Sequence, residues 1–296
     1  MTRTIDALLT ALRAEEARGV EHVDLDEGAK EILRQWFVQT RQVKKGGLKR
    51  SAAVRSEENP ATHARMEVSI EDEPASLPVR SEVRAEGDDA SEKIASLKRK
   101  ALEWAPAKAL RSLRDTMVFS TGNPSADLML VGEAPGYHEE RQQEPFVGPA
   151  GQKLNDILKA MGLARESVYI TNIVKFRPSM PQQTTNNRKP TAEEMEVCLP
   201  FIREEVKVVQ PRCIVALGAT AAEGLLALSG SVGRMRGRWH DFEGIPARVT
   251  YHPAYLLHGS AGLKDKRMIW EDMLEVMEKL SLPIGDKQRG YFLPKK

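Results

Sequence analysis

Cysteine, aromatic residues and long apolar runs are all scarce in this 296-residue chain. Two cysteines do not make a disulfide framework in a chain of this size. No apolar run approaches the roughly 20 residues that a membrane-spanning helix needs, and no secretory signal pattern is present. The 44 basic and 42 acidic side chains nearly balance, so the net charge of +2 does not by itself indicate a polyanion-binding protein. We therefore expect a cytoplasmic protein without membrane association, and a monomer.

The hydrophobic content of 41% suffices for one sizeable domain with extensions. Apolar stripes at helical spacing indicate a helical extension at residues 1–42. Residues 43–92 lose this periodicity and pass from a basic to an acidic stretch, which is typical of a disordered linker. We expect one domain at 93–285, opening with a helix that Ser91 caps, and a tail at 286–296.

Strand and helix patterns alternate through the domain, as crossover connections between parallel strands require. Short apolar runs predict strands at residues 127–131, 167–174, 213–217 and 248–251. Amphipathic spacing and Thr191, with Glu194 placed for a capping box, predict helices at residues 152–162, 191–208 and 219–228. The predicted fold is a three-layer α/β/α sandwich around a mainly parallel sheet.

Polar side chains follow three of the predicted strands. Glu133 comes directly after the strand that ends at Gly132, and Asn172 and His252 lie toward the ends of two others. The carboxyl ends of parallel strands form the rim where ligands bind in open α/β sheets. Each residue alone is equally typical of a turn or of a satisfied core polar group, but their joint placement favours a site. Phe146, on a loop rich in proline and glycine, is either an anchor of that loop or a surface for stacking on a planar base.

Several ordered motifs resemble the family 4 uracil-DNA glycosylases, within the uracil-DNA glycosylase superfamily. The resemblance covers about residues 104–280. It rests on GEAPG at 132–136, PFVGPAGQ at 145–152, TNIVK at 171–175, VALGATAA at 215–222, GRMRGRW at 233–239 and YHPAYLL at 251–257. It implies a DNA repair enzyme that flips deoxyuridine out of DNA and hydrolyses its N-glycosidic bond.

The resemblance also implies roles for individual residues. Glu133 would orient or activate water and stabilise the sugar cation, and His252 would donate a hydrogen bond to O2 of the departing base. Asn172 would read the O4 and N3 edge of uracil. The remaining expected substrate contacts are Ala134, a stacking Phe146, and Glu139. Glu139 is the candidate methyl filter, because Gly136 lies where better-known relatives carry a tyrosine that blocks the methyl group of thymine.

DNA contacts are expected from two further motifs. Arg234, Arg236 and Arg238 recur at period two, so they would share one face if the segment were extended. A solvated basic edge strand explains the same pattern equally well. By resemblance, Leu256 would probe the space that the flipped base leaves, although simple loop packing is the alternative.

The family's usual [4Fe-4S] cluster needs four cysteine ligands, and only Cys198 occupies such a place here. Phe176 stands where another ligand is expected, and Cys213 is interpreted as a core residue. We therefore predict no iron-sulfur cluster, no metal and no other cofactor. Two other functions stay open: a non-catalytic module that binds DNA damage, and a glycosylase for another deaminated base, which Gly136 and the neighbouring Tyr137 and His138 suggest.

Overall fold

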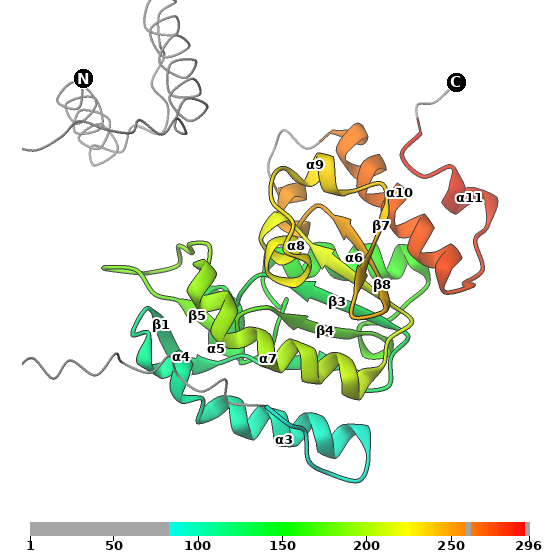
Figure 1. Ribbon diagram of the computed structural model, residues 1–296. Coiled ribbons are helices and arrows are strands. Elements are labelled where there is room, and N and C mark those ends of the chain that lie inside the picture. Colours follow the sequence, from blue (N-terminus) through cyan, green and yellow to red (C-terminus); the bar gives the residue numbers. More distant parts are fainter. Residues whose placement is uncertain (1–82, 258–261, 294–296) are drawn as a thin grey trace, which may run out of the picture. The chain divides into compact units, whose positions relative to one another are not determined.

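The computed structural model describes residues 83–257 and 262–293 (Figure 1). The chain divides into two compact units, Met1–Glu73 and Pro74–Lys296, and all described residues belong to the second. The predicted helical extension at 1–42 and most of the predicted linker lie outside the described residues. Among the described residues, no helix is long and apolar enough to cross a membrane.

A six-stranded sheet in the order β2-β4-β3-β6-β8-β7 forms the centre of the domain. Its four inner strands run parallel, whereas β2 and β7 pair antiparallel at the two edges. The strands are β2 (Ser120–Gly122), β3 (Leu128–Gly132), β4 (Tyr169–Asn172), β6 (Cys213–Leu217), β7 (Trp239–Phe242) and β8 (Ile245–Thr250). The prediction of a mainly parallel sheet is confirmed.

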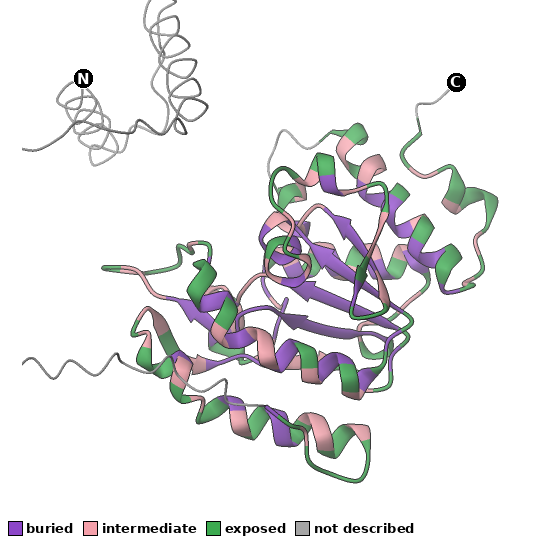
Figure 2. Ribbon diagram, in the orientation of Figure 1, coloured by how far each residue is buried: buried purple, intermediate pink, exposed green. Residues whose placement is uncertain are grey.

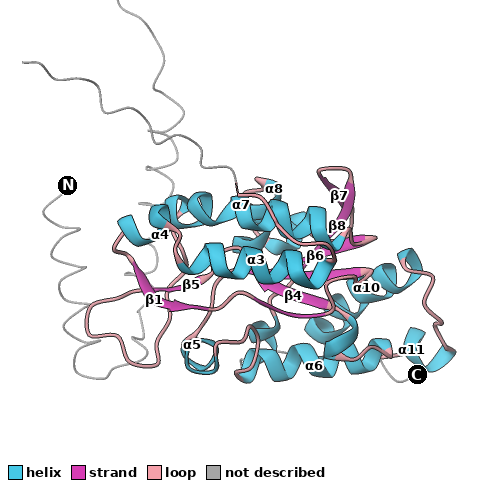
Figure 3. Ribbon diagram, turned by 90° about the horizontal axis from the view of Figure 1, so that it is seen from below, coloured by secondary structure: helices cyan, strands magenta, loops and turns pink. Residues whose placement is uncertain are grey.

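Helices cover both faces of this sheet (Figure 3). One face carries α3 (Ala90–Leu102), α4 (Ala105–Ala109), α7 (Ala192–Val209) and α8 (Ala219–Leu226). The other carries α5 (Tyr137–Gln142), α6 (Pro149–Met161), α10 (Leu263–Lys279) and α11 (Asp286–Arg289). The short α9 (Val232–Met235), η1 (Arg165–Ser167) and η2 (Pro253–Leu257) lie in connections. The three-layer prediction is therefore confirmed.

Side chains along the inner strands alternate between the two faces of the sheet, and this divides the hydrophobic core into two clusters. In β3, Met129 and Val131 belong to the cluster under α7, whereas Leu128 and Leu130 belong to the cluster under α6 and α10. Side chains of successive strand residues point to opposite faces, so a strand that is covered on both sides reads as a continuous apolar run. Figure 2 shows the result as central strands that are buried along their length.

Two helix starts show how local sequence sets the boundaries. The Thr191 hydroxyl accepts from the backbone N–H of Glu194, and the Glu194 carboxylate accepts from that of Thr191, so the predicted capping box of α7 is confirmed. The cap of α3 is Asp89 and not Ser91, because the Asp89 carboxylate accepts from the Glu92 N–H at 2.8 Å. Ser91 lies in the first turn of that helix.

A second sheet consists of two antiparallel strands, β1 (Leu113–Met117) and β5 (Phe176–Pro178), and β5 follows β4 along the chain. Between the two sheets Lys175 is fully buried, and its ammonium lies 2.5 Å from the buried Glu205 carboxylate of α7. The hydroxyls of Thr171 and Tyr169 also donate to Glu205. A buried charge needs such partners, and this network ties the end of β4 to α7.

Candidate active site

Three of the predicted site residues lie at the carboxyl ends of the parallel strands. Gly132 pairs with Asn172 across β3 and β4, so Glu133 follows one strand where Asn172 ends the next. His252 lies two residues beyond the end of β8, on the far side of β6. The structure therefore brings together the carboxylate, the amide and the imidazole on one rim.

Phe146 lies close to both Asn172 and His252. Its ring centroid lies 5.6 Å from that of His252, at an interplanar angle of 31°. A Cβ atom built on Gly132 would lie 2.3 Å from Asn172 Oδ1 and 2.5 Å from Phe146 Cζ. Only glycine allows both side chains to come this close to the strand end. The amide and the aromatic ring thus share one small space above β3.

The loop that presents Phe146 is held in an unusual conformation. Phe146 has φ +55, in the left-handed region that disfavours a bulky residue, and it is buried. A Cβ atom on Gly151 would stand 1.8 Å from the Phe146 carbonyl oxygen. Arg165 donates to the carbonyls of Pro145 and Phe146 and to the Glu144 carboxylate. These contacts fix the ring without help from a ligand.

Glu139 binds the two loops of the site to each other. Its Oε1 atom accepts from the backbone N–H groups of Val147 at 3.1 Å and Gly148 at 2.7 Å. Its Oε2 atom accepts from the N–H of Gly136 at 3.2 Å. Both carboxylate oxygens are therefore occupied by backbone. The sequence did not reveal this arrangement, because two of the three donors belong to a loop eight or nine residues away.

The environment of Glu133 favours a carboxyl group that gains a proton easily. Burial raises the pKa of Glu133 above its ordinary value, and a hydrogen bond with the Thr220 hydroxyl on α8 opposes the shift. The ammonium of Lys189 also lowers the pKa of Glu133, but burial is the larger effect. The group is thus a carboxylate of increased basicity beside a cation, which suits activation of water.

His252 is held neutral and in one tautomer. Burial lowers the pKa of His252 to about 4, and the charge of Glu139 raises it only in part. The Ala254 backbone N–H donates to Nδ1 at 3.2 Å, so the single proton of the neutral ring resides on Nε2. The site therefore contains a neutral N–H donor rather than a cation.

The family assignment follows from comparison of the sequence with known proteins. Residues 119–274, more than half of the chain, match the family model described as the uracil DNA glycosylase superfamily. The chain belongs to this superfamily. The matched range contains every residue of the rim described above.

Among the relatives, a type-4 uracil-DNA glycosylase of Pyrobaculum aerophilum is 38% identical over 160 residues, which cover 51% of this chain and 79% of the relative. A type-4 enzyme of Thermotoga maritima is also 38% identical, over 54% of this chain and 81% of its own length. A type-5 uracil-DNA glycosylase of Pyrobaculum aerophilum is 30% identical, over 55% and 75%. The resemblance to the type-4 group is thus confirmed.

A solved structure of Pedobacter heparinus SMUG2 covers 61% of this chain and 98% of its own, with a TM-score of 0.40 and 12% identity. That overlap is too small to add to the assignment.

The prediction that this superfamily member has no iron-sulfur cluster is contradicted by these relatives, because type-4 enzymes are a class that carries one. The residues at hand do not fit a four-cysteine site. Cys198 and Cys213 are both buried, and burial raises their pKa values to about 11 and about 12, so both stay protonated. No cluster of metal-ligating side chains occurs among residues 83–257 and 262–293.

The predicted arginine stripe is not an extended strand. Arg234 lies in α9, and Arg238 precedes β7. Arg236 donates to the Asp272 carboxylate at 2.8 Å and to the Met268 carbonyl, so α10 holds it in place. Arg236 binds to α10 because the carboxylate of Asp272 is buried there and its charge needs a partner. The other two arginines are exposed and make no side-chain hydrogen bond or ion pair within the described part of the chain.

The remaining predicted residues lie around the rim. Leu256 belongs to η2, where its neighbours Tyr255 and Leu257 are more exposed than it is. Ala134 is half-buried and packs against the larger core cluster. His138 lies in the first turn of α5 and is exposed.

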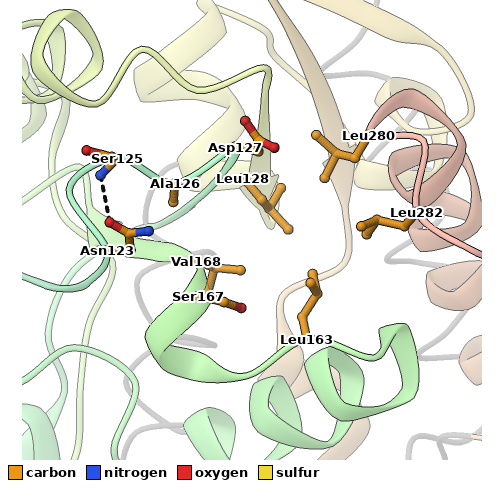
Figure 4. A pocket seen from close by; sticks show the side chains of 10 residues that line it. All are labelled: Asn123, Ser125, Ala126, Asp127, Leu128, Leu163, Ser167, Val168, Leu280 and Leu282. Atoms are coloured by element: carbon orange, nitrogen blue, oxygen red, sulfur yellow. Dashed lines mark hydrogen bonds between the residues drawn. The ribbon is translucent and has the colours of Figure 1, made fainter.

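A cavity of about 250 Å³ lies at the opposite end of the sheet (Figure 4). Leu128 and Val168, at the amino ends of β3 and β4, line it together with Leu280 and Leu282 beyond α10. This cavity is separate from the rim, because parallel strands carry Glu133 and Asn172 at their other ends. It therefore plays no part in the site.

Proposed function

We propose that this chain removes uracil from DNA by hydrolysing the N-glycosidic bond and leaves an abasic site. The observation that supports this most strongly is that Glu133, Asn172, Phe146 and His252 converge above β3 in a chain that belongs to the uracil DNA glycosylase superfamily. Relatives named as type-4 uracil-DNA glycosylases are 38% identical to this chain over about half of its length.

Recognition begins with a nucleotide that has left the base stack. Phe146 offers an aromatic face, and stacking of this kind contributes about 1–3 kcal/mol per base. The Asn172 amide offers one donor and one acceptor, which match O4 and N3–H of uracil. Cytosine has the opposite donor and acceptor pattern along that edge. A buried amide that is left unpaired by the wrong base makes such discrimination strong.

Bond cleavage uses the other two residues. As the bond between C1′ and N1 breaks, its electron pair leaves with the base, and negative charge spreads to O2. The Nε2–H group of neutral His252 donates to that oxygen. Glu133 stabilises the positive charge on the sugar and takes a proton from the water that attacks C1′. The products are an abasic sugar and the uracil anion, which solvent protonates.

DNA contacts outside the flipped nucleotide are assigned to residues that the fold leaves accessible. Arg234 and Arg238 would bind backbone phosphates, and Leu256 with its exposed neighbours would fill the emptied position in the stack. Arg236 is bound to α10 and is not assigned to DNA. A cytoplasmic location and a monomeric state stay predictions from the sequence.

The test is release of uracil from a labelled oligonucleotide, with abasic sites measured after alkaline strand cleavage. We expect wild-type protein to form abasic sites and Glu133→Gln and His252→Ala to lose most of the activity while they still bind uracil DNA. Binding without abasic sites in the wild type would favour the non-catalytic module. Release of hypoxanthine but not uracil would favour the other deaminated base.

A further inference from the structure

One side of the site is closed by a residue from a distant loop. A Cβ atom built on Gly136 would lie 2.8 Å from Glu139 Oε2 and 3.1 Å from Asn187 Nδ2. These two side chains therefore fill the space in front of Gly136. Glu139 already accepts three backbone hydrogen bonds, whereas Asn187 Nδ2 makes none with the described residues. Asn187 is exposed overall, and its Nδ2–H group lies against Gly136 without a hydrogen-bond partner among the described residues.

A buried arginine fixes the orientation of Asn187. Arg177 is 2% exposed, and its Nε–H donates to Asn187 Oδ1 at 2.9 Å. The rest of its guanidinium donates to the Glu140 carboxylate and to the carbonyls of Thr184 and Asn186. The guanidinium is planar, and five N–H groups stand in a fixed fork, so these bonds determine its plane and position. Because Oδ1 is held by Arg177, Nδ2 is directed toward Gly136.

The edges of a bound pyrimidine identify what Asn187 faces. In the proposed function His252 contacts O2 and Asn172 contacts N3 and O4, while Phe146 covers one face of the ring. The edge that none of them contacts is the C5–C6 edge. Gly136 follows Glu133 by three residues on the same loop, and its open side lies against Asn187. By elimination we assign the C5–C6 edge to the side of the site where Asn187 and Glu139 fill the space in front of Gly136.

We propose that Asn187 determines which substituent the site accepts at C5 of the pyrimidine. The proposal rests on the proposed function and names a specificity-determining residue for it. A hydrogen atom at C5 fits against the amide, whereas a methyl group or a halogen collides with Nδ2. One methyl group of misfit in a pocket corresponds to about a 10- to 200-fold difference in specificity.

The experiment compares uracil with 5-bromouracil in duplex oligonucleotides, each opposite guanine. Bromine is close to a methyl group in size, and it makes the base a better leaving group, so its release is easier to measure. We expect Asn187→Ala to raise the ratio of 5-bromouracil release to uracil release at least about tenfold. Asn187→Gln keeps an amide of greater length and should leave the ratio at or below the wild-type value.

Thr185→Ala is the matched control, because Thr185 is exposed in the same loop and makes no side-chain contact with described residues. Thermal unfolding of each variant checks that it folds. A ratio in Asn187→Ala within twofold of that in Thr185→Ala would overturn the proposal. An equal rise in the Ala and Gln variants would overturn it too, because it would indicate a general loosening of the loop.

A binding measurement separates this proposal from the proposed function. Oligonucleotides that carry 2′-fluoroarabinouridine, or the 5-methyl form of it, resist cleavage because fluorine destabilises the sugar cation. We expect Asn187→Ala to lower the Kd of the 5-methyl ligand relative to that of the unsubstituted ligand by about tenfold or more. If the wild type releases no uracil, the proposed function fails, and the two Kd values still decide the role of Asn187. An unchanged Kd ratio would refute it.

Discussion

Replacing Glu139 with glutamine tests whether one carboxylate aligns the two loops of the site. Glutamine retains one oxygen for the N–H groups of Val147 and Gly148 but places an NH2 group against the N–H of Gly136. The bond to Gly136 is lost and the other two bonds lose their charge assistance; a hydrogen bond to a charged group contributes about 1.5–3 kcal/mol, and we take the loss of the Gly136 bond as the minimum effect. If the whole loss appears in the transition state, kcat/KM for uracil release falls about 10- to 150-fold.

The assay is single-turnover release of uracil, with thermal unfolding measured on the same preparations. Glu166→Gln is the control, because it removes the same charge from an exposed residue of η1 without a side-chain partner among the described residues. The reasoning requires a slow Glu139→Gln variant and a Glu166→Gln variant close to wild type. Equal rates in the two variants would refute the assigned role of Glu139, whatever their stabilities.

Three further outcomes are expected. Burial raises the pKa of Glu133 above 4.5, and the proposed mechanism needs the carboxylate form, so kcat should fall as the pH is lowered through an inflection above 4.5. A pH-rate profile with its inflection at or below 4.5 would contradict this. Gly151→Ala places a Cβ atom against the Phe146 carbonyl, so it should lower the free energy of unfolding by on the order of 1–3 kcal/mol and abolish most uracil release. Calorimetry that shows no loss of stability would speak against this clash. Arg236→Gln should lower the unfolding temperature, because Arg236 is bound to Asp272 of α10. Arg234→Gln should leave the unfolding temperature unchanged and reduce the slope of log K against log salt for DNA binding by about 1. A stable Arg236→Gln variant with a reduced salt slope, and an unstable Arg234→Gln variant, would show that the two assignments are exchanged.

Local sequence was sufficient to predict the elements that have an uninterrupted apolar pattern or a capping motif. The run at 213–217 is buried on both faces and appears as β6 with the predicted bounds. The capping pair Thr191 and Glu194 placed the start of α7 correctly. The rim could also be predicted, because β3 and β4 are parallel and adjacent, which brings Asn172 next to Gly132. These features depend on contacts within an element or between its immediate neighbours.

Other features depend on long-range contacts and were missed. The strands β1, β2 and β5 are short and partly polar, and pairing rather than periodicity defines them. The stripe through Arg236 looked extended because nothing nearby in the sequence reveals its partner, Asp272, 36 residues further on. The contact between Asn187 and Gly136 likewise depends on Arg177, which has no distinctive local pattern. Sequence spacing carries no information of this kind.

The loop that carries Asn187 is anchored by two guanidinium groups. Arg177 holds its middle, and Arg188 donates to Ser112, Ser179 and Glu194 at its end. A guanidinium does not lose its proton under any condition in which the protein is folded. Under the proposed roles, protonation of Glu133 at low pH would slow turnover, while both guanidinium groups keep their charge and continue to donate to the carbonyls of Thr184, Asn186 and Ser179. On these proposals, the rate and the selectivity depend on separate groups, so a lower pH would slow uracil release without changing the ratio of 5-bromouracil release to uracil release.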